Sequence, residues 1–152
     1  MPSKTHLLSL ALDEALDWLT QVIDEASSDR AGRTAYERLR QAVHRSVEVL
    51  VEHQPAVTLL LRVRGNSEVE LAALRRRRDI DARLAGLVKE AIDEGSLRAD
   101  VDPALVSRLL FGMVNSLVEW HRTGGAVDGA QLSEAITTIA FDGLALGSPH
   151  QS

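Results

Sequence analysis

Long segments with a helical repeat, separated by few helix-breaking residues, constrain this chain most strongly. Proline occurs only at positions 2, 55, 103 and 149 of the 152 residues. Between these prolines and the glycine-containing turns, apolar residues recur three or four positions apart. This spacing is typical of amphipathic helices, because 3.6 residues make one turn. We therefore expect an all-α chain that forms a single domain over residues 1–152.

The predicted helices cover residues 5–26, 34–53, 67–94, 103–122 and 130–146, with a short helix over residues 55–62. Ser67 and Asp102 fit N-cap positions, and Pro103 fits the first residue of its helix. Gly95 fits the residue at which the preceding helix stops. The sequence thus predicts a bundle of five main helices and one short helix.

Composition and missing motifs exclude several classes of protein. The chain has no cysteine, which excludes disulfide scaffolds, cysteine-type zinc sites and thiol catalysis. None of its five histidines forms an HExxH motif, and the GxSxG, P-loop and dinucleotide-binding motifs are absent. We therefore expect no enzyme, no metal and no cofactor. Because no apolar run approaches the ~18 residues that span a bilayer, and no signal peptide is recognisable, we expect a cytoplasmic protein.

Four consecutive arginines at residues 75–78 form the most conspicuous charged run. Four consecutive residues point in four directions on a helix, so they make no single basic patch. Asp79 and Asp81 follow at once, and the net charge of the chain is −5, which disfavours nucleic acid as the main partner. We expect Arg75, Arg76 and Arg78 to be solvated, with local ion pairs.

Arg77 differs from the other three arginines because it falls within the apolar stripe of its helix. A charge on that face must pair with a carboxylate of the chain or meet the anion of a ligand, and both alternatives stay open. Polar or aromatic groups beside apolar stripes on several helices predict a pocket between residues 5–26, 34–53, 67–94 and 103–122. The alternative for each such group is an ordinary satisfied core residue or, for Asn115, a cap or an inter-helix hydrogen bond. The candidate ligand-binding residues are Trp18, Tyr36, His53, Arg77 and Asn115. We expect a mainly apolar or amphipathic small molecule, with Leu84 and Val88 against its tail.

The last two predicted helices carry more apolar surface than a single chain of this size buries. On the helix over 103–122, apolar residues sweep about 200° of the helical wheel, against roughly 100° for a helix that covers one core. The final helix repeats apolar or small residues at alternating steps of four and three, as coiled coils do. Gly112 and Gly143 fit either a close approach across an interface or tight packing within one chain. We expect a homodimer whose interface contains Leu109, Met113, Trp120, Leu132, Ile136, Ile139 and Gly143.

Three segments of the C-terminal half have sequences that are typical of one protein family. They read IDEGSLRADVDP over residues 92–103, LFGMVNSLVEW over 110–120 and FDGL over 141–144. Together with the arginine-bearing helix before them, they resemble the C-terminal regulatory domain of TetR-family transcriptional repressors over residues 67–146. PSKTHLL over residues 2–8 is similar to the segment that ends the helix-turn-helix domain of that family. The resemblance covers nearly the whole chain.

The resemblance implies an effector-binding and dimerisation domain of a TetR-like regulator. In that family the first helix would link the pocket to the DNA-binding head, the first five helices would enclose the effector, and the last two would dimerise. Since the chain starts where the helix-turn-helix should have finished, we expect residues 1–4 to be a remnant of that junction, residues 147–152 to be a disordered tail, and no DNA binding by this chain alone. The alternative is a headless dimerisation module that partners or titrates a full-length regulator.

Overall fold

The computed structural model describes residues 3–28, 32–121, 125 and 127–145, which form seven helices and no strand. This confirms the all-α prediction. No helix among these residues is both long and apolar enough to cross a membrane. The helices are α1 (Lys4–Ser28), α2 (Ala35–Glu52), α3 (Gln54–Leu61), α4 (Glu68–Asp93), α5 (Pro103–Asn115), α6 (Leu117–Trp120) and α7 (Gly129–Leu144).

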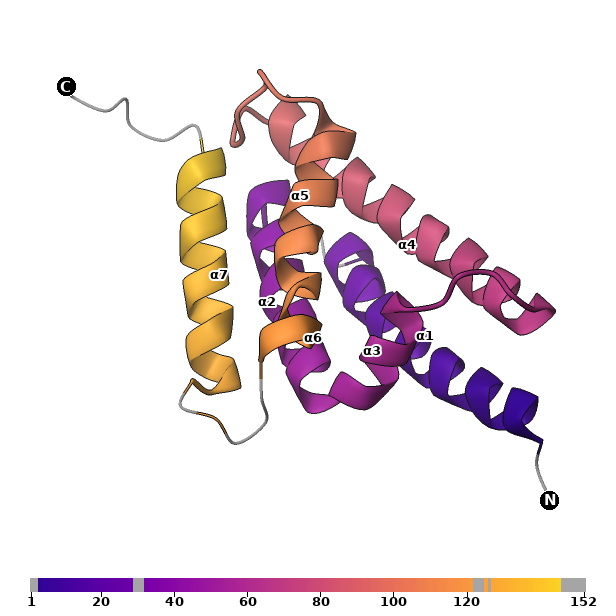
Figure 1. Ribbon diagram of the computed structural model, residues 1–152. Helices are drawn as coiled ribbons and strands as arrows, with labels where there is room; N and C mark the ends of the chain where they lie inside the picture. Colours follow the sequence, from indigo (N-terminus) through magenta and orange to yellow (C-terminus); the bar gives the residue numbers. More distant parts are fainter. Residues whose placement is uncertain (1–2, 29–31, 122–124, 126, 146–152) are drawn as a thin grey trace.

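Helix α2 lies at the centre of the bundle and contacts α1, α4, α5 and α7 (Figure 1). Helices α1 and α4 run side by side on one side of it, and α7 packs on the other. Leu39, Val43 and Val47 of α2 are fully buried, as are Leu16 of α1 and Phe141 of α7. The core therefore forms around α2, and α4 and α5 face each other beside it.

The helix starts confirm the caps predicted from sequence. The Ser67 hydroxyl accepts a hydrogen bond from the N–H of Glu70 at 3.2 Å, and the Asp102 carboxylate accepts one from Leu105 at 3.2 Å. Pro103 is the first residue of α5. Each cap satisfies a backbone donor that has no partner within its own helix, which fixes where the helix begins.

Helix α4 ends as its glycine predicts. Gly95 has φ +85°, a conformation that costs little without a Cβ. The N–H of Ser96 donates to the carbonyl of Ala91 at 3.1 Å, and the N–H of Gly95 donates to that of Ile92 at 2.9 Å. This pair of hydrogen bonds is the Schellman motif, which turns the chain towards α5.

The helix predicted over 103–122 is divided into α5 and α6 at Ser116. The hydroxyl of Ser116 donates to the carbonyl of Met113 at 2.7 Å. Such side-chain bonding to the preceding turn competes with the backbone ladder and bends helices. Helix α6 ends at Trp120, and Arg122 lies outside the described residues, as do Leu146 and the predicted tail.

A buried arginine ties α1, α2 and α4 together; we call this contact the Arg38 junction. The Arg38 side chain is 3% exposed, donates to the carbonyl of Ala26 at 3.1 Å and pairs with Glu90 at 2.6 Å. Nearby, the Glu94 carboxylate accepts the N–H of Ala35 at 2.7 Å. The junction satisfies polar groups from three helices within one chain.

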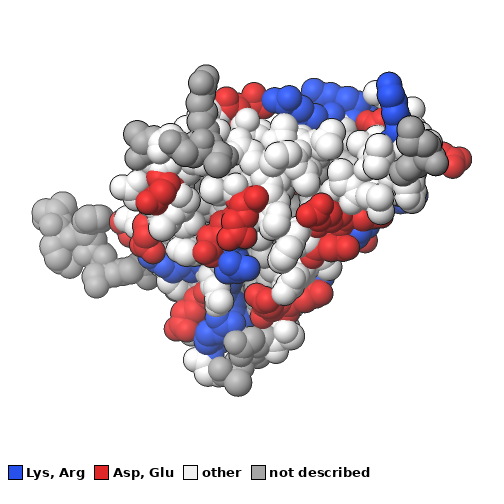
Figure 2. All heavy atoms as spheres, turned by 90° about the horizontal axis from the view of Figure 1, so that it is seen from below, with Lys and Arg blue, Asp and Glu red and all other residues white. Residues whose placement is uncertain are grey.

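Ion pairs also join α1 to α4 at the surface. Arg76 lies 2.9 Å from Asp17 and 3.6 Å from Asp13, and Arg83 lies 2.7 Å from Asp24. The expectation of local ion pairs for Arg76 is thus wrong, because side-by-side packing brings the α1 carboxylates within reach. On the face shown in Figure 2, acidic side chains are interspersed with basic ones, and the basic ones gather along one edge.

Candidate functional site

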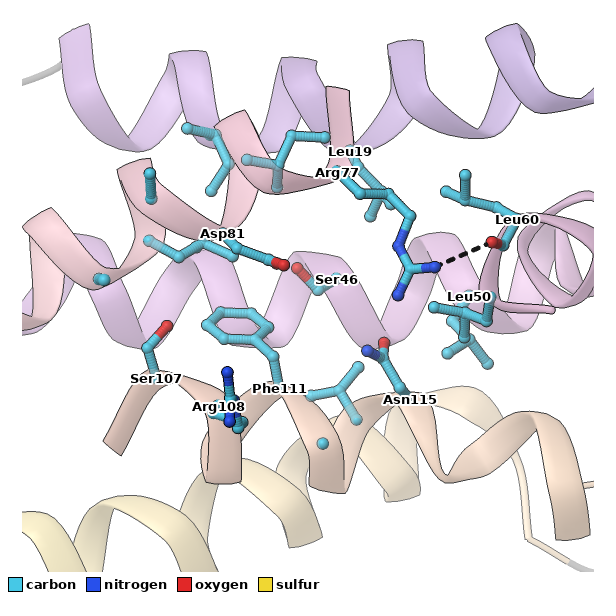
Figure 3. A pocket seen from close by; sticks show the side chains of 18 of the residues that line it. Leu19, Ser46, Leu50, Leu60, Arg77, Asp81, Ser107, Arg108, Phe111 and Asn115 are labelled. Carbon is cyan, nitrogen blue, oxygen red and sulfur yellow. Dashed lines mark hydrogen bonds between the residues drawn. The ribbon is translucent and has the colours of Figure 1, made fainter. Parts of the chain in front are cut away.

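A cavity of about 510 Å³ lies between α4 and α5 and reaches α1, α2 and α3 (Figure 3). This is the position in which the sequence analysis expects a pocket. Its volume is in the range of small-molecule sites, which are mostly apolar with a few polar groups. The apolar lining consists of Leu19, Ile23, Leu50, Val57, Leu60, Leu61, Ile80, Leu84, Phe111 and Val114.

Most of the polar residues that line the cavity lie at four-residue spacings on α4 and α5. Ser107 and Asn115 flank Phe111 at successive turns of α5, and Arg77 and Asp81 lie one turn apart on α4. Residues four apart share a helix face, so each helix presents a stripe to the cavity. The lining is therefore a consequence of helical geometry once α4 and α5 face each other.

The cavity opens to solvent between α4 and α5. Asp81 and Ala82 on α4, with Ala104, Arg108 and Gly112 on α5, are exposed at this opening. The lining residues from α2 are buried. A Cβ added to Gly112 would meet nothing within 4 Å in the described chain. Small side chains at Ala82, Ala104 and Gly112 thus leave room at the entrance, while the interior is mostly apolar.

Arg77 is half-buried and directs its guanidinium into the cavity (Figure 3). Its Nη1 donates to the backbone carbonyl of Leu60 at 3.2 Å. Within the described part of the chain, no carboxylate lies within ion-pair distance of Arg77. Of the two alternatives that the sequence leaves open, the internal ion pair is therefore not observed.

Asp81 lies at the opening and faces the cavity, where its carboxylate points towards Ser46 (Figure 3). Partial burial raises the pKa of this carboxyl, while Arg77 and Arg108 act in the opposite direction. Three ionisable groups, two positive and one negative, therefore share one electrostatic environment.

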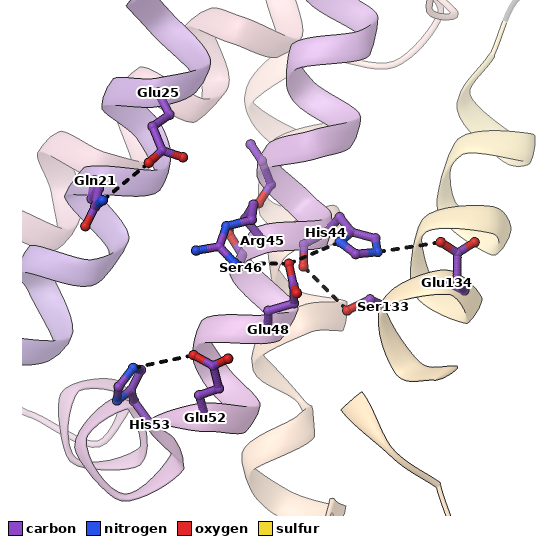
Figure 4. Close-up of polar contacts among 11 residues, drawn as sticks. Gln21, Glu25, His44, Arg45, Ser46, Glu48, Glu52, His53, Ser133 and Glu134 are labelled. Carbon is purple, nitrogen blue, oxygen red and sulfur yellow. Dashed lines mark hydrogen bonds and ion pairs between the residues drawn. The ribbon is translucent and has the colours of Figure 1, made fainter. Parts of the chain in front are cut away.

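The structure brings Arg77 and Asn115 together in the cavity but not the other three candidate residues. Trp18 and His53 stack on each other, with ring centroids 4.6 Å apart, and His53 Nε2 lies 3.8 Å from Glu52 (Figure 4). Neither of these rings lines the cavity. The stack fills the space between α1 and the start of α3.

Tyr36 lies elsewhere in the bundle and packs edge-on against Phe141, with centroids 5.4 Å apart. Leu84 lines the cavity as expected, but Val88, one turn further, is buried outside its lining. Sequence reasoning missed Asp81, Ser107 and Arg108 as lining residues. The signal that would have found Asp81 and Ser107 is their four-residue spacing from Arg77 and Phe111.

No group of three histidine or acidic side chains among the described residues is arranged to hold a metal ion. Between α2 and α7, the histidine and acidic side chains form polar contacts with one another. His44 lies 3.3 Å from Glu48 and 3.6 Å from Glu134, and the Ser133 hydroxyl donates to the His44 carbonyl at 3.5 Å (Figure 4). The contacts of His44 with Glu134 and Ser133 join α7 to α2.

Because α7 packs on α2, some of the residues predicted for the dimer interface are buried within the chain and others are exposed. Leu132 and Ile136 are buried in the core of the chain. Gly143 is exposed, and a Cβ added there or at Gly112 would meet nothing within 4 Å, so neither glycine serves tight packing among the described residues. The exposed apolar set of α5–α7 consists of Leu105 (46% exposed), Leu109 (63%), Met113 (36%), Trp120 (56%) and Ile139 (68%), of which Leu105 was not predicted.

Known protein families and solved structures contain proteins similar to this chain. The family model for the C-terminal domain of tetracyclin repressor-like proteins matches residues 32–144. The crystal structure of SCO3833, a TetR-family member from Streptomyces coelicolor A3, is 47% identical with a TM-score of 0.86, covering 95% of this chain and 72% of that one. AibR, solved with isovaleryl coenzyme A and operator DNA, shares the fold at 20% identity and a TM-score of 0.78, covering 91% of this chain and 75% of AibR.

Among curated proteins, the transcriptional repressor KstR2 matches in two organisms. The Rhodococcus jostii protein is 35% identical over 65 residues, which is 43% of this chain and 31% of that protein. The Mycolicibacterium smegmatis protein is 24% identical over 150 residues, covering 93% of this chain and 70% of that protein. These relatives are transcriptional regulators and not enzymes, in line with the lack of catalytic motifs in the sequence. Because the family model covers most of the chain, the chain belongs to the TetR family of transcriptional regulators and contains its C-terminal domain.

Proposed function

We propose that this chain is the effector-binding and dimerisation domain of a TetR-family transcriptional regulator, and that a small, mainly apolar or amphipathic molecule binds in the cavity. The observation that carries the proposal is the cavity itself. It is lined by residues of five helices, most of them apolar, and it is open to solvent between α4 and α5. AibR, which shares the fold, is a precedent for a regulator that binds an acyl thioester.

The cavity supports a mechanism in which the ligand controls DNA binding through α1. Leu19 and Ile23 of α1 form part of the wall, and Asp17 and Asp24 next to them hold α1 to α4. A ligand that binds one arrangement of α1 and α4 more tightly shifts the population towards it. In family members with a helix-turn-helix before this domain, such a shift would change the spacing of the two DNA-reading helices of a dimer.

A thermal-shift screen of fatty acids, acyl thioesters and sterol-like acids tests the proposal. A ligand at 100 times its dissociation constant stabilises the fold by about 2.7 kcal/mol. Ala85→Trp places an indole at the cavity wall and should abolish this stabilisation. Lys89→Trp, one turn further on the same helix and exposed, is the matched control. If hits bind equally well to Ala85→Trp, the ligand site lies elsewhere.

The exposed apolar set of α5–α7 supports dimerisation. These side chains lie on helices that pack against the core with their other faces, so an exposed Leu109 or Ile139 has no use in the described monomer. A second copy would cover them, and we expect it to bury more than about 1,000 Å² in total. Light scattering at micromolar concentration measures the mass directly, and a monomer would contradict this part of the proposal.

We further propose that this chain by itself does not read DNA. The net charge of −5 disfavours nucleic acid as the main partner, and on the face shown in Figure 2 acidic side chains are interspersed with basic ones. Mobility-shift assays on duplex DNA at low salt should show negligible affinity. Salt-sensitive binding at nanomolar concentration would refute this and point to Arg75 and Arg78, which are exposed on α4.

A further inference from the structure

The Arg77 guanidinium lacks the counter-ion that its surroundings demand. It lies half-buried among leucines, and its one hydrogen bond goes to a neutral carbonyl, that of Leu60. A guanidinium has five N–H donors, so four of them are without a partner in the described chain. A cation in an apolar site is costly unless an anion neutralises it. Because Arg77 faces the cavity, an anionic group of a ligand in the cavity would neutralise it.

The carboxylate in the best position to pair with Arg77 does not do so. Asp81 is one turn along the same helix, at the i+4 spacing at which opposite charges commonly pair. Arg77 instead turns towards Leu60 and Asn115, whereas Asp81 points towards Ser46 (Figure 3). Arg108 stands across the opening on α5, and it forms no ion pair with any described residue. All three charges therefore face the cavity rather than one another.

The neutral lining beside Arg77 suits an acceptor group. The side-chain amide of Asn115 points towards the guanidinium (Figure 3) and forms no hydrogen bond within the described residues. The guanidinium and this amide lie at the same end of the cavity, which Leu50 and Leu60 also line (Figure 3). Charge-assisted hydrogen bonds of this kind are the strong ones, and a guanidinium matches a carboxylate with two parallel bonds.

We propose that the cavity selects an amphipathic ligand with a single negative charge, whose anionic group binds Arg77 beside Asn115, and that Asp81 discriminates against a second negative charge. This inference rests on the proposed ligand pocket. The two arginines and one aspartate leave one positive charge, which a monoanion neutralises. A carboxylic acid with an apolar body fits this requirement, and a phosphate monoester, with close to two charges at neutral pH, fits it less well.

Four probes that share a ten-carbon chain separate the charge from the apolar contacts: decanoate, decanol, decylamine and decyl phosphate. Calorimetry with the full chain at neutral pH and low salt should show decanoate binding about tenfold more tightly than decanol or decylamine, the effect of one charge-assisted hydrogen-bonded pair. Decyl phosphate should bind more weakly than decanoate.

Two substitutions assign the selection to residues. Arg77→Gln should reduce the affinity for decanoate to that for decanol, while Arg78→Gln, its exposed neighbour outside the cavity, should leave the preference unchanged. Asp81→Asn should raise the affinity for decyl phosphate to at least that for decanoate. Because Asp81 is exposed, this variant keeps the test informative if Arg77→Gln unfolds.

The outcomes separate this inference from the proposed function. Equal affinities for decanoate and decanol would leave the pocket in place but overturn the charge selection. Tightest binding of decylamine, lost in Asp81→Asn, would make Asp81 rather than Arg77 the group that reads the ligand. Binding of none of the four probes would contradict both the selection and the pocket.

Discussion

The two sides of the bundle differ in whether their side chains find partners within the chain. On the α1–α2–α4 side, polar groups find partners within the chain: Arg38 bonds to Ala26 and Glu90, and Arg76 and Arg83 reach carboxylates of α1. On the α5–α7 side, large apolar side chains such as Leu109 and Ile139 stay in solvent. The polar contacts of the first side close within one chain, although Leu7, Leu10 and Leu71 are exposed there too. In the proposed dimer, a partner would cover the apolar set of the second side.

This difference separates the folding of the subunit from its association. Contacts that close within one chain contribute to the stability of each subunit, whereas exposed apolar groups contribute only when a second surface covers them. Substitutions on the α1–α2–α4 side should therefore change the free energy of unfolding. Substitutions in the exposed apolar set should change the oligomeric state.

The largest effect is expected on the α5–α7 side. Ile139→Asp would place a carboxylate without a partner in the proposed interface, and we expect it to raise the dimer dissociation constant at least about a hundredfold, or about 3 kcal/mol. Light scattering across a dilution series measures this. Leu71→Asp, which places the same charge at an exposed leucine of α4, should leave the dimer intact. An unaltered dimer after Ile139→Asp would move the interface away from α7.

The next largest effect is expected at the Arg38 junction. Arg38→Met keeps the apolar stem but leaves Glu90 and the Ala26 carbonyl without their donor. We expect a loss of roughly 2–4 kcal/mol in the free energy of unfolding, below the top of the range for buried pairs because the Glu90 side chain is 37% exposed. The melting temperature at fixed protein concentration should fall by about 10 °C. Gln41→Met, exposed on the same helix, is the control, and equal melting of both variants would contradict the role of Arg38.

A smaller effect is expected for the surface ion pairs of α1 and α4. Arg76→Gln removes contacts to Asp13 and Asp17, whose side chains are 59% and 72% exposed. Exposed pairs contribute at most about 1 kcal/mol and weaken in salt. Urea unfolding in low and high salt should therefore show a small loss that disappears at high salt. A large, salt-independent loss would mean that Arg76 has a structural role which the exposed pairs do not explain.

The smallest effect concerns the segment that joins α4 to α5. Arg98 bonds both oxygens of Asp100 at 2.7 Å, and this lowers the pKa of the Asp100 carboxyl from 3.8 to about 2. Because the folded-state pKa is depressed, the stabilisation is complete above the unfolded value of 3.8 and is lost as the pH falls through about 2. An NMR titration measures this pKa directly. Arg98→Gln should return it to near 3.8, and an unchanged value would show that Arg98 is not the cause.

Local signals in the sequence were enough for most of the helix boundaries. The caps at Ser67 and Asp102, the proline at 103 and the glycine at 95 act within one turn of the chain, so their effect does not depend on distant contacts. The break at Ser116 was not predicted, because a serine within a helix bends it only when its hydroxyl bonds to the preceding turn.

The candidate site was predictable only in part. Periodicity placed Arg77 on the inner face of α4, since the face of a helical residue follows from its number alone. It did not reveal that Trp18 meets His53 or that Tyr36 meets Phe141, because such contacts depend on how helices far apart in sequence cross. The same reason explains why Leu132 and Ile136 face α2 while Ile139 stays exposed.

The sequence by itself determined that the chain is all-α, where most of its helices begin and end, and which family it resembles, because these depend on composition and on residues close together in the chain. Only the tertiary structure decided which charges meet. Asp17 pairs with Arg76 because α1 lies along α4, and Arg77 lacks a carboxylate because its side chain turns away from Asp81. A charge interacts with whatever packing brings within a few ångströms. For Arg77, the distance to a carboxylate depends on how five helices pack around the cavity, and a local sequence pattern does not encode this packing.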